Sequence, residues 1–538
     1  MKKEAKGSGQ ESPLFSGQRT ADFTNCQLQF WGAAIVIALY WLLLCVLVMK
    51  NYRLDVIEQY VVGREWVFGS SKHPSLTALL LEVFFRITLQ WEIAPYLLAR
   101  LCILITLWAI WRLAREYLSD SLALIAVFAM FSYSFFQYGC TEYNNNITLN
   151  MAWACAVFFI FKALHTNKLR WWILSGFCLG IGLHFKYTLI ILPLMVVLFL
   201  ILDPQGRPFW KKKGPWITIL VAVLLFLPHG IWIYQNGFIT LKYASSRIPS
   251  PGSWTAHIVY PLCFIGSQLV LILPTILPLV PLCGWIGKPD FSKAGRTFES
   301  RFLIWIVLAP FALQILLSAI KGAQIPTALG SHLWLFLSVL LLHVLKTDHT
   351  EKRIQQSKRS ALILCLVLAS LSMMIAWTGP YFTHRASRYQ FPGRALAEEA
   401  ERCWHKNHQE KLPAIVGPWW PAGNIAVYGK DRPPVYANAL PDSFLDGPLL
   451  LPQRPHPEKI NQTGGIVVWF IPRDAANDYS PPRLLERFPK AVLQKPVPLL
   501  YQTSAELRPL WVGLAVVDPP DPLPKNNLEL RDPDRKIE

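Results

Sequence analysis

Residues 28–49 read LQFWGAAIVIALYWLLLCVLVM, a stretch of 22 residues without a charged side chain. A helix that crosses the hydrocarbon core of a bilayer needs about 20 mostly apolar residues. The stretch is too long for the apolar core of a secretory signal and has no convincing cleavage site, so it is typical of a membrane anchor. We therefore expect a membrane-spanning helix here, preceded by a polar cytoplasmic segment over residues 1–27.

Similar apolar runs recur along the chain. Of its 538 residues, 53% are hydrophobic and 16% are charged, whereas about 25% are charged in a typical soluble protein. These features predict a polytopic α-helical membrane protein with about eleven spans. The expected spans are 28–49, 94–111, 121–138, 147–164, 171–185, 187–202, 216–234, 256–285, 302–320, 327–345 and 360–378.

The loops between these runs alternate in charge. Basic loops such as GRPFWKKKG (206–214) alternate with loops that carry few basic residues. Because cytoplasmic loops are enriched in Lys and Arg, the basic set should face the cytoplasm. The loops expected on the outer face, together with the C-terminal region, are 50–92, 139–146, 184–187, 235–254 and 321–326.

The composition changes after about residue 380. Prolines multiply, and short strand-like pieces appear in PAIVGP, PPVYAN, GGIVVWFI and LWVGLAVVD. Leu396, Ala400 and Cys403 recur at helical spacing, which predicts one helix at the start of this region. We expect a membrane domain over 28–380, a small periplasmic α/β domain over 381–518, and an extended tail over 519–538.

The long outer loop 50–92 holds the first candidate site. Asp55 and Glu58 lie three residues apart in LDVIEQYVVG, and on a helix they would share one face. A partly screened carboxylate at a membrane boundary can act as a general base toward a hydroxyl group or bind a cation. Ordinary solvated loop acids are the plainer alternative. The later apolar piece LTALLLEVFFRI (76–87) is too short to span and predicts an interfacial helix.

Four basic side chains fall on the same predicted face. Lys72 and His73, in SSKHPSL, could bind a phosphate, although a lysine beside a helix start is also common. Lys186 lies within about thirty nearly uncharged residues, where a lysine needs a boundary or a partner. Arg247 lies in the outer loop 235–254. The net charge of +18 agrees with contacts to anionic lipid or to a phosphate-bearing ligand.

The segment CTEYNNNITLN completes the outer set. Its asparagines can cap a helix or hydrogen-bond sugar hydroxyls. We take as candidate substrate-binding residues Glu142, Tyr143, Asn145, Asn146 and Tyr187. A transporter would also place polar groups near the middle of the membrane, where few occur in this sequence.

An aspartate in the first outer loop, an HP motif before an amphipathic helix and a later KY between two spans resemble a known family. It is the C-type (GT-C) membrane glycosyltransferases of family 39, which include protein O-mannosyltransferases and bacterial lipid A aminoarabinose and galacturonic acid transferases. The segment GPWWPAGNIAVYGKDRPPVY also looks like bacterial members. The resemblance covers roughly residues 28–380.

The resemblance implies roles for particular residues. Asp55 corresponds to the catalytic acid of the first loop, with Glu58 as a helper. Lys186 and Arg247 look like residues that contact the donor phosphate. His73 falls where relatives of the aminoarabinose type have a lysine that contacts the lipid phosphate, and Lys72 stands in place of an acidic neighbour; we take both as candidate phosphate-binding residues. Many relatives have an aspartate where this chain has Asn146, so a metal site with two acids is not carried over.

The resemblance also implies a function. It is sugar transfer, with inversion, from a polyprenyl-phosphate donor to lipid A, another glycolipid or a protein at the outer face of a bacterial inner membrane. The alternative is a flippase or transporter of a lipid-linked sugar. No cofactor is certain, a divalent cation is left open, no metal ligands are assigned, and nucleic acid is not an expected partner.

Overall fold

The computed structural model describes residues 13–137, 139, 141–249, 252–284, 287–290, 295–438, 449–452, 456–472, 479–481 and 484–520, with side chains from residue 24 onward. The chain divides into two compact units. A helical unit comprises residues up to 391 together with 502–506, and a sheet unit comprises 392–501 and the residues from 507 onward. Most of the predicted tail, from residue 521, lies outside the described residues.

Within the described residues, seven helices are long and apolar enough to cross a membrane. They are Thr24–Val48 within α1 (Pro13–Val48), α4 (Ala94–Tyr117), α6 (Asn145–Thr166), α9 (Lys213–Gln235), the stretch Ala256–Cys283, α13 (Phe298–Lys321) and α15 (Glu351–Thr383). Three shorter apolar helices are α5 (Asp120–Phe131), α7 (Leu169–Phe185) and the stretch Tyr187–Leu202, which contains α8 (Ile191–Leu202). The predicted polytopic α-helical fold is confirmed.

Two expected spans are less regular than their apolar composition suggests. The stretch Ala256–Cys283 comprises α11 (Ala256–Ile276), a 3₁₀ turn over Leu277–Leu279 and α12 (Val280–Cys283). The expected span 327–345 begins with a 3₁₀ turn over Thr327–Gly330 and is α-helical only in α14 (Leu337–Val344). Pro326, Gly330 and the prolines after residue 273 disrupt regular helix, because proline lacks a backbone donor and glycine favours other conformations.

Close backbone packing holds the shorter apolar helix α7 against the spanning helix α9. Gly176 and Gly180 form a GxxxG pattern on α7, facing α9. A Cβ atom on Gly176 would lie 2.6 Å from the Thr218 carbonyl oxygen, and one on Gly180 would lie 2.9 Å from that of Ala222. Small residues at this spacing let two helix backbones approach each other within a membrane.

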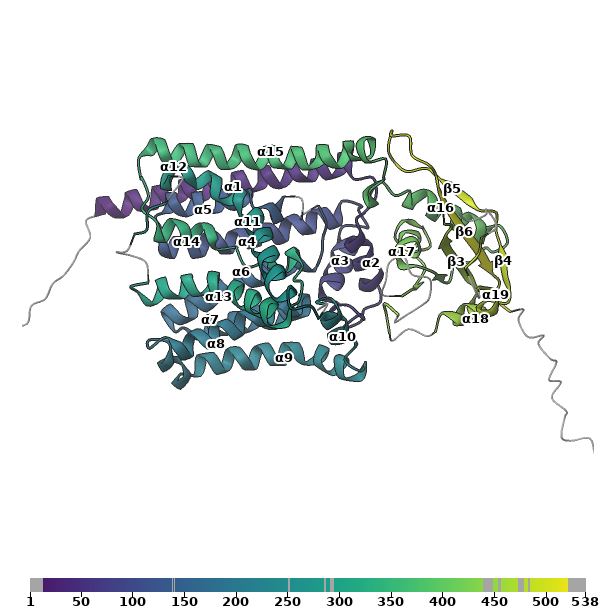
Figure 1. Ribbon diagram of the computed structural model, residues 1–538, viewed down its shortest axis with the longest axis horizontal. Coiled ribbons are helices and arrows are strands. Elements are labelled where there is room, and N and C mark those ends of the chain that lie inside the picture. Colours follow the sequence, from purple (N-terminus) through teal and green to yellow (C-terminus); the bar gives the residue numbers. More distant parts are fainter. Residues whose placement is uncertain are drawn as a thin grey trace, which may run out of the picture. The chain divides into compact units, whose positions relative to one another are not determined.

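Short helices lie at one end of the helical unit. They are α2 (Leu54–Gly63), α3 (Leu76–Ile87) and α10 (Ile239–Ser246), as Figure 1 shows. The apolar segment 76–87 forms α3, in agreement with the predicted short helix.

The sheet unit contains a mixed sheet of order β2-β1-β3-β6-β4, with β5 also pairing with β6. The strands are β1 (Ile415–Val416), β2 (Val435–Tyr436), β3 (Gly465–Phe470), β4 (Ala491–Leu493), β5 (Val497–Leu499) and β6 (Leu510–Val517). Its helices are α16 (Gly393–His405), α17 (Trp419–Tyr428), α18 (Ile460–Thr463) and α19 (Leu484–Arg487). β1 is parallel to β2 and β3, whereas β6 is antiparallel to its neighbours.

The predicted secondary structure of this unit agrees with the observed elements. All four strand-like pieces contain strands, and the predicted opening helix is α16, which buries Leu396, Ala400 and Cys403. A cluster that includes Val416, Val467 and Trp469 forms the core of the unit.

Candidate active site

The first turn of α2 is held by a carboxylate from a distant segment. Arg53, the residue before the helix, makes no side-chain cap. Instead the Asp55 backbone N–H donates to Glu142 Oε1 over 2.6 Å, which satisfies one of the unpaired donors that every helix start has. Arg53 reinforces the contact, because its Nε lies 3.4 Å from Glu142 Oε2 and its guanidinium donates to Thr141 Oγ1 over 2.6 Å. Glu142 therefore positions the Asp55 backbone.

The two acids of α2 have different surroundings. The Asp55 side chain is partly exposed, and no hydrogen bond or ion pair joins its carboxylate to a residue that the structure describes. Glu58 is 7% exposed, and its Oε2 lies 2.7 Å from Lys72 Nζ, itself 7% exposed. Burial raises the pKa of Glu58, while the Lys72 charge acts in the opposite direction. Asp55 is open to a ligand, and Glu58 is already bonded to Lys72.

A tight turn presents His73 next to this pair. Ser70 Oγ accepts from the backbone N–H groups of Lys72 and His73 over 3.3 and 3.2 Å, and the Ser70 N–H donates to the His73 carbonyl over 2.9 Å. The His73 ring packs edge-on against Tyr243 of α10, with centroids 5.9 Å apart. Burial and the charges of Lys186, Lys72 and Arg247 lower the pKa of His73 to about 3. His73 is therefore a neutral hydrogen-bonding group near pH 7.

The same turn needs glycine at one position. A Cβ atom on Gly69 would lie 2.5 Å from the Trp232 ring. Behind the turn, His229 Nδ1 lies 2.7 Å from the Phe68 carbonyl oxygen, and His229 Nε2 lies 2.7 Å from the Tyr187 hydroxyl. A ring nitrogen that faces a carbonyl must carry the proton, so Nδ1 donates to Phe68 and Nε2 accepts from Tyr187. Tyr187 thus fixes the turn through His229.

Lys186 lies between α7 and the apolar stretch Tyr187–Leu202. Its Nζ donates to Asn146 Oδ1 over 2.6 Å, and both side chains are partly exposed. Burial lowers the pKa of Lys186 to about 8, against the opposing effect of the Asp55 charge and with a further lowering from Arg247. Arg247, at the end of α10, is exposed. Asp55 and Arg247 thus both lie within electrostatic range of Lys186.

Residues 143–145, which precede and begin α6, mainly make contacts that hold neighbouring elements together. Asn144 accepts from the N–H groups of Asn146 and Ile147 and so caps α6. Asn145 accepts from Gln59 Nε2 over 3.0 Å and donates to the Phe185 carbonyl over 2.8 Å, which links α2 to the end of α7. The buried Tyr143 hydroxyl donates to the Thr77 carbonyl over 3.0 Å.

The predicted site residues, together with Tyr243, thus fall into two sets. The open set has partly or fully exposed side chains and comprises Asp55, His73, Asn146, Lys186, Tyr187, Tyr243 and Arg247. The paired set is buried and comprises Glu58, Lys72, Glu142, Tyr143 and Asn145. The structure brings both sets to one end of the helical unit, and the catalytic and binding roles predicted from the sequence stay predictions. No group of three His, Cys, Asp or Glu side chains that could hold a metal occurs in the described part of the chain.

Several residues of the site were missed by the sequence analysis. They include Arg53, Gln59, His229 and Tyr243. Two of them carry a signal in the sequence: His229 is a lone histidine in an apolar run, and Tyr243 precedes Arg247 by one helical turn. The contacts of Arg53 and Gln59 depend on segments more than eighty residues away and leave no local pattern.

Comparison with known proteins finds one matching family model, one relative and a shared fold. Residues 72–232 match the model of the dolichyl-phosphate-mannose-protein mannosyltransferase family. The predicted resemblance to family 39 is confirmed. Over 274 residues the chain is 23% identical to the lipopolysaccharide core galacturonosyltransferase RgtA of Rhizobium johnstonii, which covers 48% of this chain and 52% of the relative. The chain thus matches about half the length of this relative.

Two solved structures share the fold across both units. They are ArnT from Cupriavidus metallidurans bound to undecaprenyl phosphate, with a TM-score of 0.60, and the same protein in its apo state, with a TM-score of 0.58. Both are 14% identical and cover 92% of this chain and 98% of the other. At this identity the likeness shows a shared fold.

Proposed function

We propose that this protein transfers a sugar from a polyprenyl-phosphate donor to an acceptor of the bacterial cell envelope, at the outer face of the inner membrane. The observation that carries the proposal is the Asp55 carboxylate, which is partly exposed and lies within electrostatic range of Lys186, as Arg247 also does. A carboxylate next to two cations suits a reaction that takes a proton from one group and releases an anion from another.

Asp55 orients the acceptor hydroxyl and takes its proton. The acceptor oxygen attacks the anomeric carbon from the face opposite the phosphate, so the new glycosidic bond forms as the bond to the phosphate oxygen breaks, with inversion. Where the acceptor group is already ionised, Asp55 serves only to position it. Glu142 supports this step by fixing the Asp55 backbone.

The departing lipid phosphate carries the charge that develops in the reaction. Lys186 and Arg247 provide positive charge, and His73 provides a neutral N–H donor. Asn146 holds the Lys186 ammonium in place from one side. Preorganised donors of this kind supply a large part of the rate enhancement in many enzymes. ArnT, which shares the fold, was solved with undecaprenyl phosphate, in agreement with a lipid-phosphate donor.

The acceptor class is the next element of the proposal. The relative RgtA is described as a galacturonosyltransferase of the lipopolysaccharide core. We therefore take lipopolysaccharide as the first acceptor to test, ahead of other glycolipids and proteins.

The test compares envelope lipids from cells with and without this protein by mass spectrometry. We expect one sugar mass to be present on lipopolysaccharide only when the protein is present. A second assay uses sealed vesicles with a labelled polyprenyl-phosphate sugar. Transfer breaks the sugar–phosphate bond, whereas relocation of the intact lipid across the bilayer would contradict the proposal and support a flippase.

A further inference from the structure

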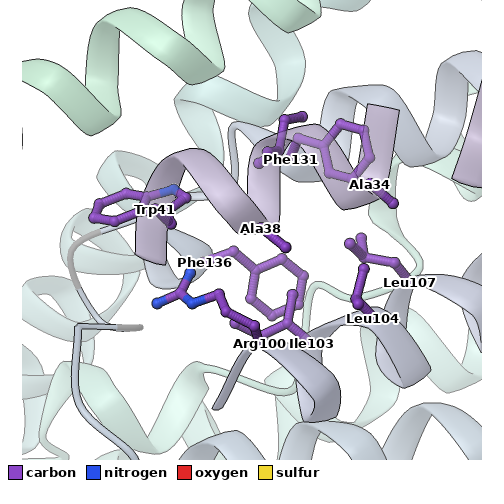
Figure 2. Close-up of a pocket in the computed structure, with 10 residues that line it drawn as sticks. Ala34, Ala38, Trp41, Arg100, Ile103, Leu104, Leu107, Phe131 and Phe136 are labelled. Carbon is purple, nitrogen blue, oxygen red and sulfur yellow. The ribbon is translucent and has the colours of Figure 1, made fainter. Parts of the chain in front are cut away.

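The hollow between α1 and α4 is too small to hold a ligand. Figure 2 shows its lining, with Arg100 and Trp41 among apolar side chains. The space inside has room for about one water molecule. This hollow therefore provides no site, and the exposed charges of the helical unit are the stronger feature.

Six exposed basic side chains lie where α7 and α9 begin. Two of them precede or begin α7, and the other four lie in the 3₁₀ turn before α9, directly after that turn and at the first residue of α9. We call these six side chains the basic patch: Lys168, Arg170, Arg207, Lys211, Lys212 and Lys213.

The packing of α7 on α9 brings the two segments of the basic patch together. Thr218 Oγ1 of α9 donates to the Trp172 carbonyl of α7 over 2.8 Å. The Trp172 ring covers Gly214, where a Cβ atom would clash with the indole, and its centroid lies 6.1 Å from that of the Phe209 ring. The basic patch is thus one surface that tertiary contacts build from two separate segments.

No acid neutralises the basic patch. Within the part of the chain that the structure describes, none of its six side chains forms an ion pair. The nearest acid along the chain, Asp203, accepts from Arg301 Nε over 2.5 Å, and Glu116 Oε1 lies 2.9 Å from Lys162 Nζ. Cations that are held close together without a counter-ion attract anions from outside the protein.

The basic patch lies at the opposite end of the helices from the candidate active site. α7 ends at Phe185, next to Lys186, and α9 leads to α10, which is followed by Arg247 (Figure 1). At 1.5 Å per residue, the 17 residues of α7 extend about 26 Å and the 23 residues of α9 about 34 Å. These lengths are close to the roughly 30 Å of a hydrocarbon core, so the basic patch lies at the other membrane surface.

Apolar side chains continue from the basic patch along the two helices. Trp216, one residue turn into α9, is 58% exposed, and its indole N–H donates to the Trp210 carbonyl over 3.1 Å. Indole rings are typical of the membrane–water interface. The exposed side chains beyond it are Ile173 and Phe177 on α7 and Ile219, Leu220 and Val223 on α9. A molecule with an anionic head and apolar chains fits this sequence of surfaces.

We propose that the basic patch binds the phosphate head groups of anionic phospholipids in the leaflet opposite the candidate active site, with acyl chains along the exposed side chains of α7 and α9. Basic residues in excess orient any membrane protein. The basic patch differs because packing holds cations from two segments together beside exposed apolar side chains. Clusters of four to eight Lys and Arg at the end of a membrane helix are typical of contacts with anionic lipid. The site does not depend on the reaction proposed above.

The first test uses the purified full-length protein and native mass spectrometry, with phosphatidylglycerol and the neutral phosphatidylcholine added in equal amounts. We expect phosphatidylglycerol to be retained about tenfold more, because each basic side chain near an anionic head group raises affinity about fivefold. Excess inorganic phosphate should not displace it, since a free ion gains nothing from the apolar surface. Equal retention of the two lipids, or displacement by inorganic phosphate, would overturn the proposal.

Matched triple variants locate the site. Lys211→Gln/Lys212→Gln/Lys213→Gln should lower the retention of phosphatidylglycerol to that of phosphatidylcholine. The control Lys352→Gln/Arg353→Gln/Arg359→Gln removes the same charge from exposed positions on α15 and should keep the preference. An equal loss in both variants would show that retention follows net charge alone and would contradict the proposal.

Thermal melting checks that each triple variant is folded. Where the patch variant does not fold, Arg170→Gln replaces it, with Arg359→Gln as its control. Arg170→Gln should lower the preference for phosphatidylglycerol about fivefold, and Arg359→Gln should leave it unchanged. An undiminished preference in the folded patch variant contradicts the proposal.

Discussion

The open set and the paired set lie side by side and contain the same kinds of side chain, yet their contacts differ. Glu58 and Lys72 are buried and bonded to each other, whereas Asp55 and Lys186 remain partly exposed. Asp55 and Glu58 are separated by less than one turn of α2. Burial and pairing, more than residue type, thus separate groups that can meet a ligand from groups that hold the site together. The following predictions test this division, from the largest expected effect to the smallest.

Asp55→Asn should have the largest effect on sugar transfer. The amide cannot take a proton, and loss of a general base lowers a rate by about 10²- to 10⁴-fold. The measurement is transfer from a polyprenyl-phosphate sugar by reconstituted protein with matched thermal stability. Glu92→Gln removes an exposed acid from the same loop and should leave transfer unchanged. A folded Asp55→Asn variant with full activity would defeat the assignment.

Lys72→Met should mainly affect stability. It leaves Glu58 as a buried carboxylate without its cation, and removal of one partner of a buried ion pair costs about 3–5 kcal/mol. The double variant Lys72→Met/Glu58→Leu should recover most of this loss, because well-packed apolar groups can replace such a pair. Chemical unfolding in detergent measures both variants. A double variant no more stable than Lys72→Met would show that the pair has another role.

Lys186→Met should slow transfer about 10²-fold, the usual cost of losing one donor to a developing charge. Its matched control is Lys242→Met, which removes an exposed lysine from α10. Stability should change little in either variant, and transfer rates at saturating donor separate them. Equal rates would place Lys186 outside the reaction.

The titration of Glu142 should have a smaller effect, which is a dependence of the free energy of unfolding on pH. Burial and the neighbouring Asp55 charge raise its pKa to about 8, against an ordinary value of 4.5. Between these two values the folded protein keeps a proton that the unfolded chain releases, so stability should fall as the pH rises from about 4.5 to about 8. Glu142→Gln can still accept from the Asp55 N–H and should flatten this part of the profile. Glu351→Gln, at an exposed position, should retain it.

The sequence predicted the fold, and it grouped residues that the structure brings to one end of the helical unit, but it did not predict the contacts among them. Length and apolarity suffice to locate spanning helices, because a bilayer imposes both. Asp55, Lys186 and Arg247 could be grouped because charge alternation placed their loops on one face. The span expected at 327–345 is mostly not α-helical, since average apolarity does not register Pro326 and Gly330.

The sequence alone could not predict which side chains of the site bond to one another. Lys72 could equally have faced a ligand or Glu58, and only the turn at Ser70 directs it to the carboxylate. The sequence analysis grouped Glu142 with the candidate sugar-binding residues. The structure shows that its side chain accepts a hydrogen bond from the first turn of α2. Contacts between segments about ninety residues apart produce no periodic pattern in the sequence, so they could not be predicted from it.

The carboxylate that completes the start of α2 also has a consequence for biosynthesis. Asp55 and Glu142 are 87 residues apart. At a translation rate of 5–20 residues per second, Glu142 leaves the ribosome roughly 4–17 s after Asp55. Until then the first turn of α2 lacks its acceptor, so the loop that carries Asp55 reaches its final form only after α4 and α5 have been made. In any chain truncated before residue 142, the Asp55 backbone N–H at the start of α2 would therefore lack the side-chain acceptor that Glu142 provides.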